Sequence, residues 1–434
     1  MAMQRFVSGS REQAFLLPPD MREWLSEDHL VWLVVEAIAR CDTRPFAAAY
    51  RDDGQGRPAY DPAVLATLLV YAYAVGERSS RAIERRCRED VAFRVAAAGL
   101  APDHVTIARF RRRHADALCG LFAGVLRLCA AVGLVRVGLV AIDGTKLRAD
   151  ANKDRLEPDA AERVVSEILD QAERVDAAEE ALEGDAERAL CGLAPERLGD
   201  AGGRAAQLDA AADLLARRAR PARPRSALTS AERLAGGARA QGRELAARRR
   251  QRHNQTDPES RLMRSPSGWI QGYNAQVAVD ESHLIVACDV TQDGFDNHQL
   301  APMIAHTEAA LEHAGVTRPV GCFLADGGYW SGGPIDELQA AGKPLLVPAN
   351  GRPRTKNLRP SETVQKMERR LRHHANRRRY RRRQALVEPV IAHAKVGRRF
   401  TRFHLRGLAG AKLEWSLACT AHNLARLATH HRTA

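Results

Sequence analysis

The 434-residue sequence predicts an α/β protein, with a mixed sheet, a helical N-terminal domain and a helical insertion within the sheet. Three observations lead to this class. Residues 1–135 have helical periodicity, residues 136–154 and 256–434 carry apolar strand-like runs between helices, and residues 155–255 are rich in Ala, Glu and Arg. We expect these segments to be the three domains, and a chain of this length is long enough for them.

The first domain is predicted to consist of short helices. Residues 25–38 place apolar side chains at helical spacing, and Asp61 followed by Pro62 is typical of a helix start. Two further helices are predicted over 79–90 and 103–118.

The helix predicted over 103–118 combines an apolar face with a basic one. Val105, Ile107, Ala108 and Phe110 are expected to point inward, and Arg109, Arg111, Arg112 and Arg113 outward. A basic helix at the end of a helical module favours a helix-turn-helix-like domain whose last helix lies on DNA. A plain helical bundle with a solvated basic face is the alternative.

Residues 155–255 are expected to form a helical or coiled-coil insertion. Apolar residues recur at helical spacing near its start, two prolines interrupt the pattern at 218–226, and a basic helix follows. We find no catalytic candidate in this segment.

The sheet elements lie on both sides of this insertion. An apolar run over 137–142 predicts a buried strand that leads into Asp143, and we expect Gly144 to end it. A hairpin follows across Glu281 and Ser282. The remaining elements are a helix at 298–315, a strand at 320–330 that contains Asp326, a helix at 333–342 and a strand at 344–349.

Three strands followed by helix, strand, helix and strand is the order of a ribonuclease H-like sheet. In that topology the first and fourth strands are neighbours, so we expect Asp143 and Asp326 to lie side by side at their ends. Asp143 alone would more simply be a turn residue. Converging carboxylates require a cation, and hard oxygen donors suit Mg²⁺ (or Mn²⁺), with two ions per site for phosphodiester chemistry.

The net charge of +13 and the pI near 9.7 indicate a polyanionic partner, although a generally basic proteome is the alternative. Between Arg369 and Arg406 the chain has thirteen arginines and one lysine but a single acid, Glu388. We expect Glu388 to be the third carboxylate, at a helix kink or restart caused by Pro389. A basic helix with one compensating acid is the simpler interpretation of this segment alone.

Other features bear on the cellular location. The longest apolar run, 65–75, is too short to span a membrane, and the N-terminus lacks the layout of a signal peptide. The eight cysteines are scattered singly. We therefore expect reduced thiols, a cytoplasmic location and no membrane partner.

Several motifs together resemble bacterial insertion-sequence transposases of the DDE class. They are "AIDGTK" (141–146), "GYNAQVAVD" (272–280), "LADGGY" (324–329), "YRRRQALVEPVIAHAK" (380–395) and "AHNLARL" (421–427). The resemblance implies that the catalytic and metal-binding acids are Asp143, Asp326 and Glu388.

The family's Tyr-Arg-Glu-Lys signature maps onto Tyr380, Arg383, Glu388 and Lys395. The gap between arginine and glutamate is four residues here, whereas the broad signature has three, so Arg382 or Gln384 are alternatives to Arg383. The resemblance implies that Tyr380, Arg383 and Lys395 bind DNA phosphates near the scissile bond, and Lys146 is a weaker phosphate candidate. Tyr329 and Trp330 are candidates for stacking on an unpaired base, with core packing as the alternative.

The implied activity is metal-dependent nicking at the ends of an insertion sequence, followed by joining of the 3′-hydroxyl to target DNA. The implied partners are the terminal inverted repeats, the target DNA and a second protomer in a synaptic complex. A decayed transposase that only binds DNA, and a ribonuclease H-like nuclease without strand transfer, are the alternatives.

Overall fold

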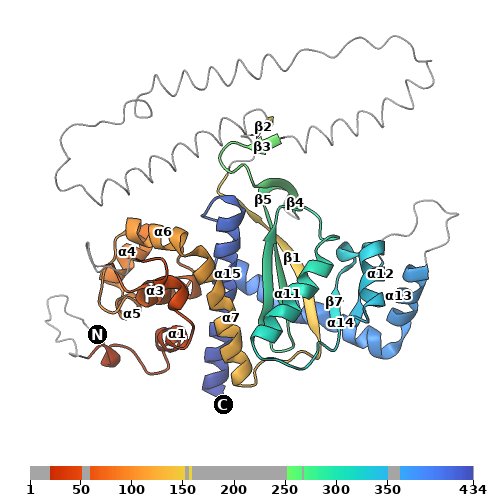
Figure 1. Ribbon diagram of the computed structural model, residues 1–434, viewed down its shortest axis with the longest axis horizontal. Helices are drawn as coiled ribbons and strands as arrows, with labels where there is room; N and C mark the ends of the chain where they lie inside the picture. Colours follow the sequence, from red (N-terminus) through yellow and green to blue (C-terminus); the bar gives the residue numbers. More distant parts are fainter. Residues whose placement is uncertain are drawn as a thin grey trace, which may run out of the picture.

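The computed structural model of the protein describes residues 20–50, 59–151, 156–158, 252–265, 268–349 and 362–433. It has the mixed α/β class that the sequence predicts, with a helical N-terminal region followed by a curled mixed sheet (Figure 1). After a short turn, η1 (Met21–Glu23), the N-terminal helices are α1 (Leu30–Ala39), α2 (Arg44–Ala47), α3 (Pro62–Ala74), α4 (Ser80–Glu89), α5 (Val91–Ala96), α6 (His104–Arg113) and α7 (Ala115–Ala131).

Helix α3 begins where the sequence predicts. The Asp61 side chain accepts a hydrogen bond from the Ala63 amide at 2.8 Å, and Pro62 occupies the first helical position. The basic helix α6 is shorter than expected because it ends at Arg113, where the chain bends by 76° into α7. Val105 is 44% exposed, so the expectation that it points inward is wrong.

The long C-terminal helix α15 (Gly407–Thr433) joins the N-terminal helices to the sheet. It packs against α7 and α3 on one side and against strand β6 (Ile285–Thr291) on the other (Figure 1). Fully buried Glu414 strengthens this junction: it accepts hydrogen bonds from the Tyr73 hydroxyl at 3.1 Å and from the His404 amide at 2.6 Å. The N-terminal helices and the sheet therefore share one core.

The sheet contains β1 (Val140–Arg148), β4 (Arg261–Ser265), β5 (Gly268–Val279), β6, β7 (Phe323–Ala325) and β8 (Leu345–Leu346). Strand β1 pairs with β5 in the antiparallel sense and with β7 in the parallel sense. Strands β6 and β4 are antiparallel to β5, and β8 is parallel to β7. The first strand of the sheet and the strand before Asp326 are thus neighbours, as the sequence predicts.

Strand β1 does not end at Gly144, which corrects the expectation from sequence. Gly144 pairs with Gln276 in the middle of the β1–β5 ladder, and the strand continues to Arg148. A glycine inside a strand usually marks a place where another group approaches the backbone closely.

The remaining helices follow in the order α11 (Leu300–His313), the short turn η2 (Gly327–Tyr329), α12 (Gly332–Ala340), α13 (Glu362–Arg372), α14 (His374–Ala392) and the π-turn η3 (His393–Gly397). Helix α14 runs past Pro389, so of the two expected alternatives at this residue, a kink or a restart, the restart is wrong. Ala385, which would accept from residue 389, is exposed, so water can replace the missing hydrogen bond.

The ends of the predicted insertion are held together at its base. Strand β2 (Leu156–Pro158) pairs with β3 (Arg252–Asn254), which brings residues 158 and 252 opposite each other. The rest of the insertion, including the expected coiled coil, lies outside the described residues.

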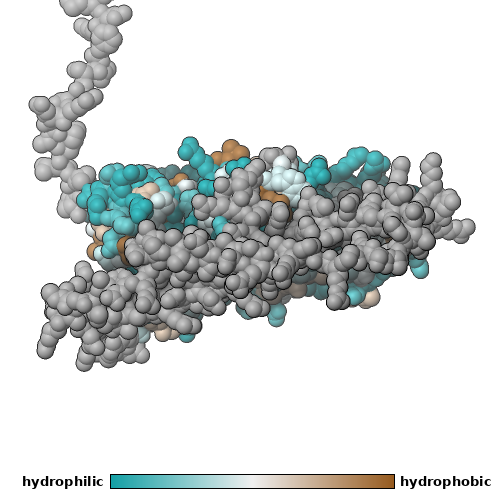
Figure 2. All heavy atoms as spheres, turned by 90° about the horizontal axis from the view of Figure 1, so that it is seen from above, coloured by the Kyte–Doolittle hydropathy of each residue, from teal (hydrophilic) through white to brown (hydrophobic). Residues whose placement is uncertain are grey.

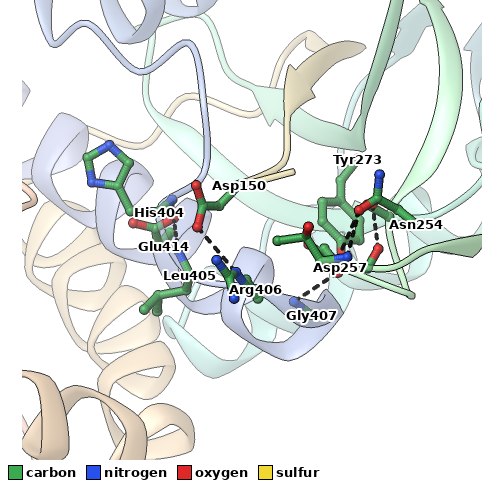
Figure 3. A network of polar contacts seen from close by, with 11 residues as sticks. Asp150, Asn254, Asp257, Tyr273, His404, Leu405, Arg406, Gly407 and Glu414 are labelled. Atoms are coloured by element: carbon green, nitrogen blue, oxygen red, sulfur yellow. Dashed lines mark hydrogen bonds and ion pairs between the residues drawn. The ribbon is translucent and has the colours of Figure 1, made fainter. Parts of the chain in front are cut away.

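Side chains around this base also fix the start of α15 (Figure 3). Asp257 accepts a hydrogen bond from the Gly407 amide at 3.2 Å, and Glu259 accepts one from the Leu408 amide at 2.6 Å. Both carboxylates complement the positive end of the helix dipole. Arg406 pairs with Asp150 at 3.2 Å, so the chain is anchored on each side of the insertion.

The visible described surface in Figure 2 is mostly hydrophilic, with small separate apolar spots. Within the described part of the chain, no helix by itself has the length and apolar character to cross a membrane; α6 and α7 meet the test only as a bent pair.

We predict that replacing residues 160–250 with about six Gly/Ser residues leaves a folded protein. The pairing of β2 with β3 already brings the two flanks together. Shortening the loop from residues 160–250 to about six residues halves its length about four times. Each halving should stabilise the fold by about 0.6 kcal/mol, because closing a shorter loop costs less entropy. Circular-dichroism melting against the full-length chain measures this, and failure of the shortened chain to fold would place part of the insertion in the core.

Candidate active site

Two aspartates stand side by side at the end of the β1–β7 pair. The parallel register matches Ile142 with Ala325, and Asp143 and Asp326 are the next residue of each strand. Adjacent strands lie about 4.8 Å apart, so the two backbones hold these residues close together. The two carboxylates also influence each other electrostatically.

Asp143 is largely enclosed. Its carboxylate accepts a hydrogen bond from Arg383 Nη1 at 3.0 Å and another from the Gly144 amide at 2.8 Å. Burial raises the pKa of Asp143; the Arg383 charge opposes this shift, and the negative charge of Asp326 adds to it. A buried carboxylate beside a second one favours the approach of a cation.

Asp326 is half-buried and caps the turn η2. Its side chain accepts a hydrogen bond from the Gly328 amide at 2.8 Å. This hydrogen bond holds the carboxylate at the strand end, where the chain turns.

Basic and phenolic groups from α14 and η3 surround this pair. Tyr380 hydrogen-bonds to Arg383, and burial raises its pKa. Lys395 is half-buried in the π-turn; burial lowers its pKa, and the charge of Asp143 opposes that shift. Three of the residues mapped onto the family signature thus lie beside the aspartates.

The structure distinguishes Arg383 from its neighbours. Arg383 is 9% exposed and contacts Asp143, whereas Arg382 points elsewhere and pairs with Glu281 at 2.7 Å. Gln384 is exposed. Of these three candidates for the signature arginine, Arg383 is therefore the one that reaches Asp143.

Glu388 is placed differently from the two aspartates. It lies on α14 five residues after Arg383 and is exposed, while the adjacent Val387 is fully buried. Among the described residues, no three Asp, Glu, His or Cys side chains are grouped so that they could hold a metal ion. The predicted third acid is thus not brought to the other two in this structure.

The donor chemistry of the aspartate pair nevertheless fits a hard divalent cation. Mg²⁺ typically takes one or two carboxylates and completes its coordination with water and substrate phosphate oxygens. Asp143 and Asp326 offer such oxygens at one sheet edge, next to cationic side chains that suit a phosphate.

Lys146 and the two aromatic candidates differ in their surroundings. The Lys146 ammonium lies 3.5 Å from Asp296, and its side chain is 19% exposed. Tyr329 is 1% exposed, and its hydroxyl donates a hydrogen bond to the side-chain oxygen of Gln276. The expectation that it stacks on a base is therefore wrong. Trp330 is half-buried and packs against the core.

The basic helix α6 is only partly available to DNA. Arg111 is 3% exposed and donates to the Arg78 carbonyl and the Ser80 hydroxyl, each at 3.1 Å, which corrects its predicted outward position. Arg109 and Arg112 are exposed, and exposed Arg113 lies over the Tyr50 ring.

A pocket of about 480 Å³ lies away from the aspartates. Its walls include Val320 and Phe323 at the start of β7 and Pro344 just before β8. Because the aspartates lie beyond the other ends of the strands, this pocket belongs to a different part of the sheet.

Comparison with protein families identifies the class. Residues 19–113 match a family described as a transposase domain (DUF772), and residues 348–428 match one described as a transposase DDE domain. The first match covers α1–α6, and the second covers α13–α15. No curated protein and no solved structure matches the chain at a significant level.

The two matched segments, which together span less than half of the chain, support a transposase of the DDE class, as its motifs suggest. The second matched segment contains Tyr380, Arg383, Glu388 and Lys395, while Asp143 and Asp326 precede it. Such enzymes cleave and transpose DNA, bind DNA and generally use divalent metal ions.

The sequence reasoning missed a group of residues beside the aspartates: Asn274, Gln276 and Asp296. The amides of Asn274 and Gln276 donate to Asp296 at 2.7 and 2.9 Å, and Gln276 also contacts Tyr329. The alternation of polar side chains in "YNAQ" was the available signal, because positions 274 and 276 share one face of a strand.

We predict that Arg383→Gln destabilises the protein far more than Arg382→Gln. The side chains of Arg383 and Asp143 are 10% and 19% exposed, so removing one partner leaves a largely buried charge. This should lower the free energy of unfolding by about 2–4 kcal/mol. The Arg382–Glu281 pair is more open, and its loss should cost less than about 1 kcal/mol. Urea unfolding of both variants provides the comparison, and equal losses would contradict a structural Asp143–Arg383 contact.

We also predict opposite behaviour for two neighbouring arginines of α6. Arg111→Ala should lower the free energy of unfolding by about 2–3 kcal/mol, because buried hydrogen-bond partners lose their donor. Because Arg112 is exposed, Arg112→Ala should leave the free energy of unfolding unchanged. It should reduce the slope of the logarithm of DNA affinity against the logarithm of salt concentration by about one. Thermal melts and DNA affinity across a salt series test both; an unchanged slope for Arg112→Ala would assign it to a solvated face.

Proposed function

We propose that this transposase binds the ends of an insertion sequence, nicks them by metal-dependent hydrolysis and joins the freed 3′-hydroxyl to target DNA. The observation that supports this most directly is the placement of Asp143 and Asp326 at the ends of two adjacent parallel strands, with Arg383 and Lys395 beside them. We also propose that the sheet is ribonuclease H-like, because its strand pairing has that arrangement.

Both chemical steps are in-line displacements at phosphorus. In the first, a water oxygen bonds to the phosphorus and the 3′-oxygen leaves as a hydroxyl, so one strand is nicked. In the second, that 3′-hydroxyl attacks a phosphodiester of the target, and the target's own 3′-oxygen leaves. Each step forms one phosphorus–oxygen bond and breaks another, so one set of residues can support both.

Asp143 and Asp326 would hold Mg²⁺ or Mn²⁺, which when bound lowers the pKa of water and stabilises the leaving oxygen. Glu388 is the proposed third ligand. Glu388 is exposed on α14 and would have to move toward the aspartates when DNA and cation are bound.

The cationic groups have a separate role. Lys395 and Lys146 would contact phosphates near the scissile bond, with Tyr380 as a hydroxyl donor. Arg383 would hold Asp143 in position and stay close enough to meet a phosphate oxygen. The exposed arginines of α14 would follow the DNA backbone: Arg377, Arg378, Arg379, Arg381 and Arg382.

A strand-transfer assay with the element's ends and a target DNA separates two alternatives. A decayed transposase would bind the element's ends without cutting them, and a nuclease would cut without joining. We expect two protomers in the complex that pairs the ends. We expect the reaction to use Mg²⁺ or Mn²⁺ and to take place in the bacterial cytoplasm.

We predict that Asp143→Asn and Asp326→Asn abolish nicking of end DNA while leaving DNA affinity within about threefold. The substitutions keep the side-chain shape but remove the charge that would hold the cation. Asp289→Asn is the matched control, because Asp289 lies on β6 and pairs with Lys412 instead of the site. Labelled inverted repeats from the gene's own flanks, with and without Mg²⁺, provide the assay; metal-independent nicking or an active Asp143→Asn would refute the assignment.

A further inference from the structure

A buried polar network lies behind Asp143, on the opposite face of the β1–β5 pair, and it involves none of the acids assigned to catalysis. Its centre is Gln276 on β5, which is 1% exposed. The Gln276 amide group donates to Asp296 Oδ1 at 2.9 Å, and its carbonyl oxygen accepts a hydrogen bond from the Tyr329 hydroxyl. Both polar atoms of this side chain are thus committed.

The network extends along β5 through Asn274 and to the neighbouring strand β1 through Lys146. Asn274, which is fully buried, donates to the same Asp296 oxygen at 2.7 Å and to the Asp293 carbonyl at 3.2 Å. Lys146 approaches the other oxygen of Asp296 at 3.5 Å. Asp296 therefore fixes the loop before α11 to β5 and β1.

Gly144 explains how these groups come so close to the aspartates. Gly144 pairs with Gln276, and paired residues share a face of the sheet, so the Gln276 amide lies over the glycine. A side chain at 144 would collide: its Cβ would meet the Gln276 amide nitrogen and lie 2.7 Å from Asp296 Oδ1. Gly144 thus leaves the space that the Gln276 amide and the Asp296 carboxylate occupy.

Tyr329 connects this network to the second aspartate. It closes the turn η2, which follows Asp326, and its side chain is fully buried. Its hydroxyl lies within electrostatic reach of Asp296, Asp143 and Asp326. The Tyr329–Gln276 hydrogen bond therefore ties the Asp326 turn to β5, two strands away, across the space left by Gly144.

We propose that Gln276 and Tyr329 are positioning residues, which fix the Asp326 turn relative to Asp143 and so set the separation of the two carboxylates for a divalent cation. Gly144 provides the space for them, and Asp296 and Asn274 orient Gln276. This inference deepens the proposed function, because it rests on the two aspartates being cation ligands.

The test measures cation binding directly, independently of DNA cleavage. Mn²⁺ is titrated into the full-length protein and followed by electron paramagnetic resonance, with Asp143→Asn defining the signal from the site. Tyr329→Phe removes one oxygen atom and leaves the ring in place. We expect it to weaken Mn²⁺ binding by about 10- to 100-fold, as loss of a group that orients metal ligands typically does.

Tyr73→Phe is the matched control. Tyr73 is also a buried tyrosine, and its hydroxyl donates to the carboxylate of Glu414 at the junction with α15, remote from the aspartates. Both substitutions remove a buried hydrogen bond and should lower the melting temperature similarly, but only Tyr329→Phe should alter Mn²⁺ affinity. A second variant, Gly144→Ala, should weaken Mn²⁺ binding as well, because its methyl group displaces the flexible ends of Gln276 and Asp296.

The outcomes separate this inference from the proposed function. Mn²⁺ affinity within twofold of wild type in both Tyr329→Phe and Gly144→Ala overturns the positioning role, even if the protein nicks DNA normally. An equal loss of affinity in Tyr73→Phe also overturns it, since the effect would then follow stability alone. Asp143-dependent Mn²⁺ binding that weakens in Tyr329→Phe, without any nicking by wild type, supports the positioning role and refutes the proposed chemistry. Absence of Asp143-dependent binding in wild type overturns both.

Discussion

The parallel pairing of β1 with β7 is the constraint on which the rest of the site depends. Three residue pairs define it, and all six side chains are buried, from Val140 opposite Phe323 to Ile142 opposite Ala325. Because side chains alternate between the faces of a sheet, a slip by one residue would send one aspartate to the opposite face. The apolar core on both faces prevents that slip, so the position of two charges is determined by residues that carry none.

The alternation along β1 also divides the site between two faces. Asp143 shares its face with Val277, on the side where α14 supplies Arg383. Gly144 and Lys146 share the other face with Gln276 and Asn274. The short motif that begins at Asp143 therefore serves both sides at once: the carboxylate faces the basic helix, and the glycine next to it leaves room for the amides behind it.

Local patterns predicted the elements but not the partners of their side chains. The apolar run before Asp143 and the Asp61–Pro62 start of α3 depend on neighbouring residues, so the sequence was sufficient for both. The burial of Arg111 depends on the Arg78 carbonyl, and that of Tyr329 depends on Gln276, which is 53 positions earlier. Gly144 was interpreted as a strand end because a glycine has the same local signature in a turn and under a close contact. Such differences arise only when distant strands meet.

The buried arginines show why net charge is a poor measure of the surface that meets DNA. Arg383 is committed to Asp143, Arg111 to α4 and its neighbouring loop, and 5% exposed Arg398 to the carbonyls of Ala74 and Ala421. Burial lowers the pKa of Arg398 to about 10, which leaves it charged at neutral pH but without access to phosphate. These three count toward the +13 of the sequence, yet they join helices to one another and to the sheet. Counterion release depends on phosphates that are neutralised, so these three buried arginines add nothing to the electrostatic part of DNA affinity. In this chain arginine thus has two separate roles, and burial decides which one each residue has.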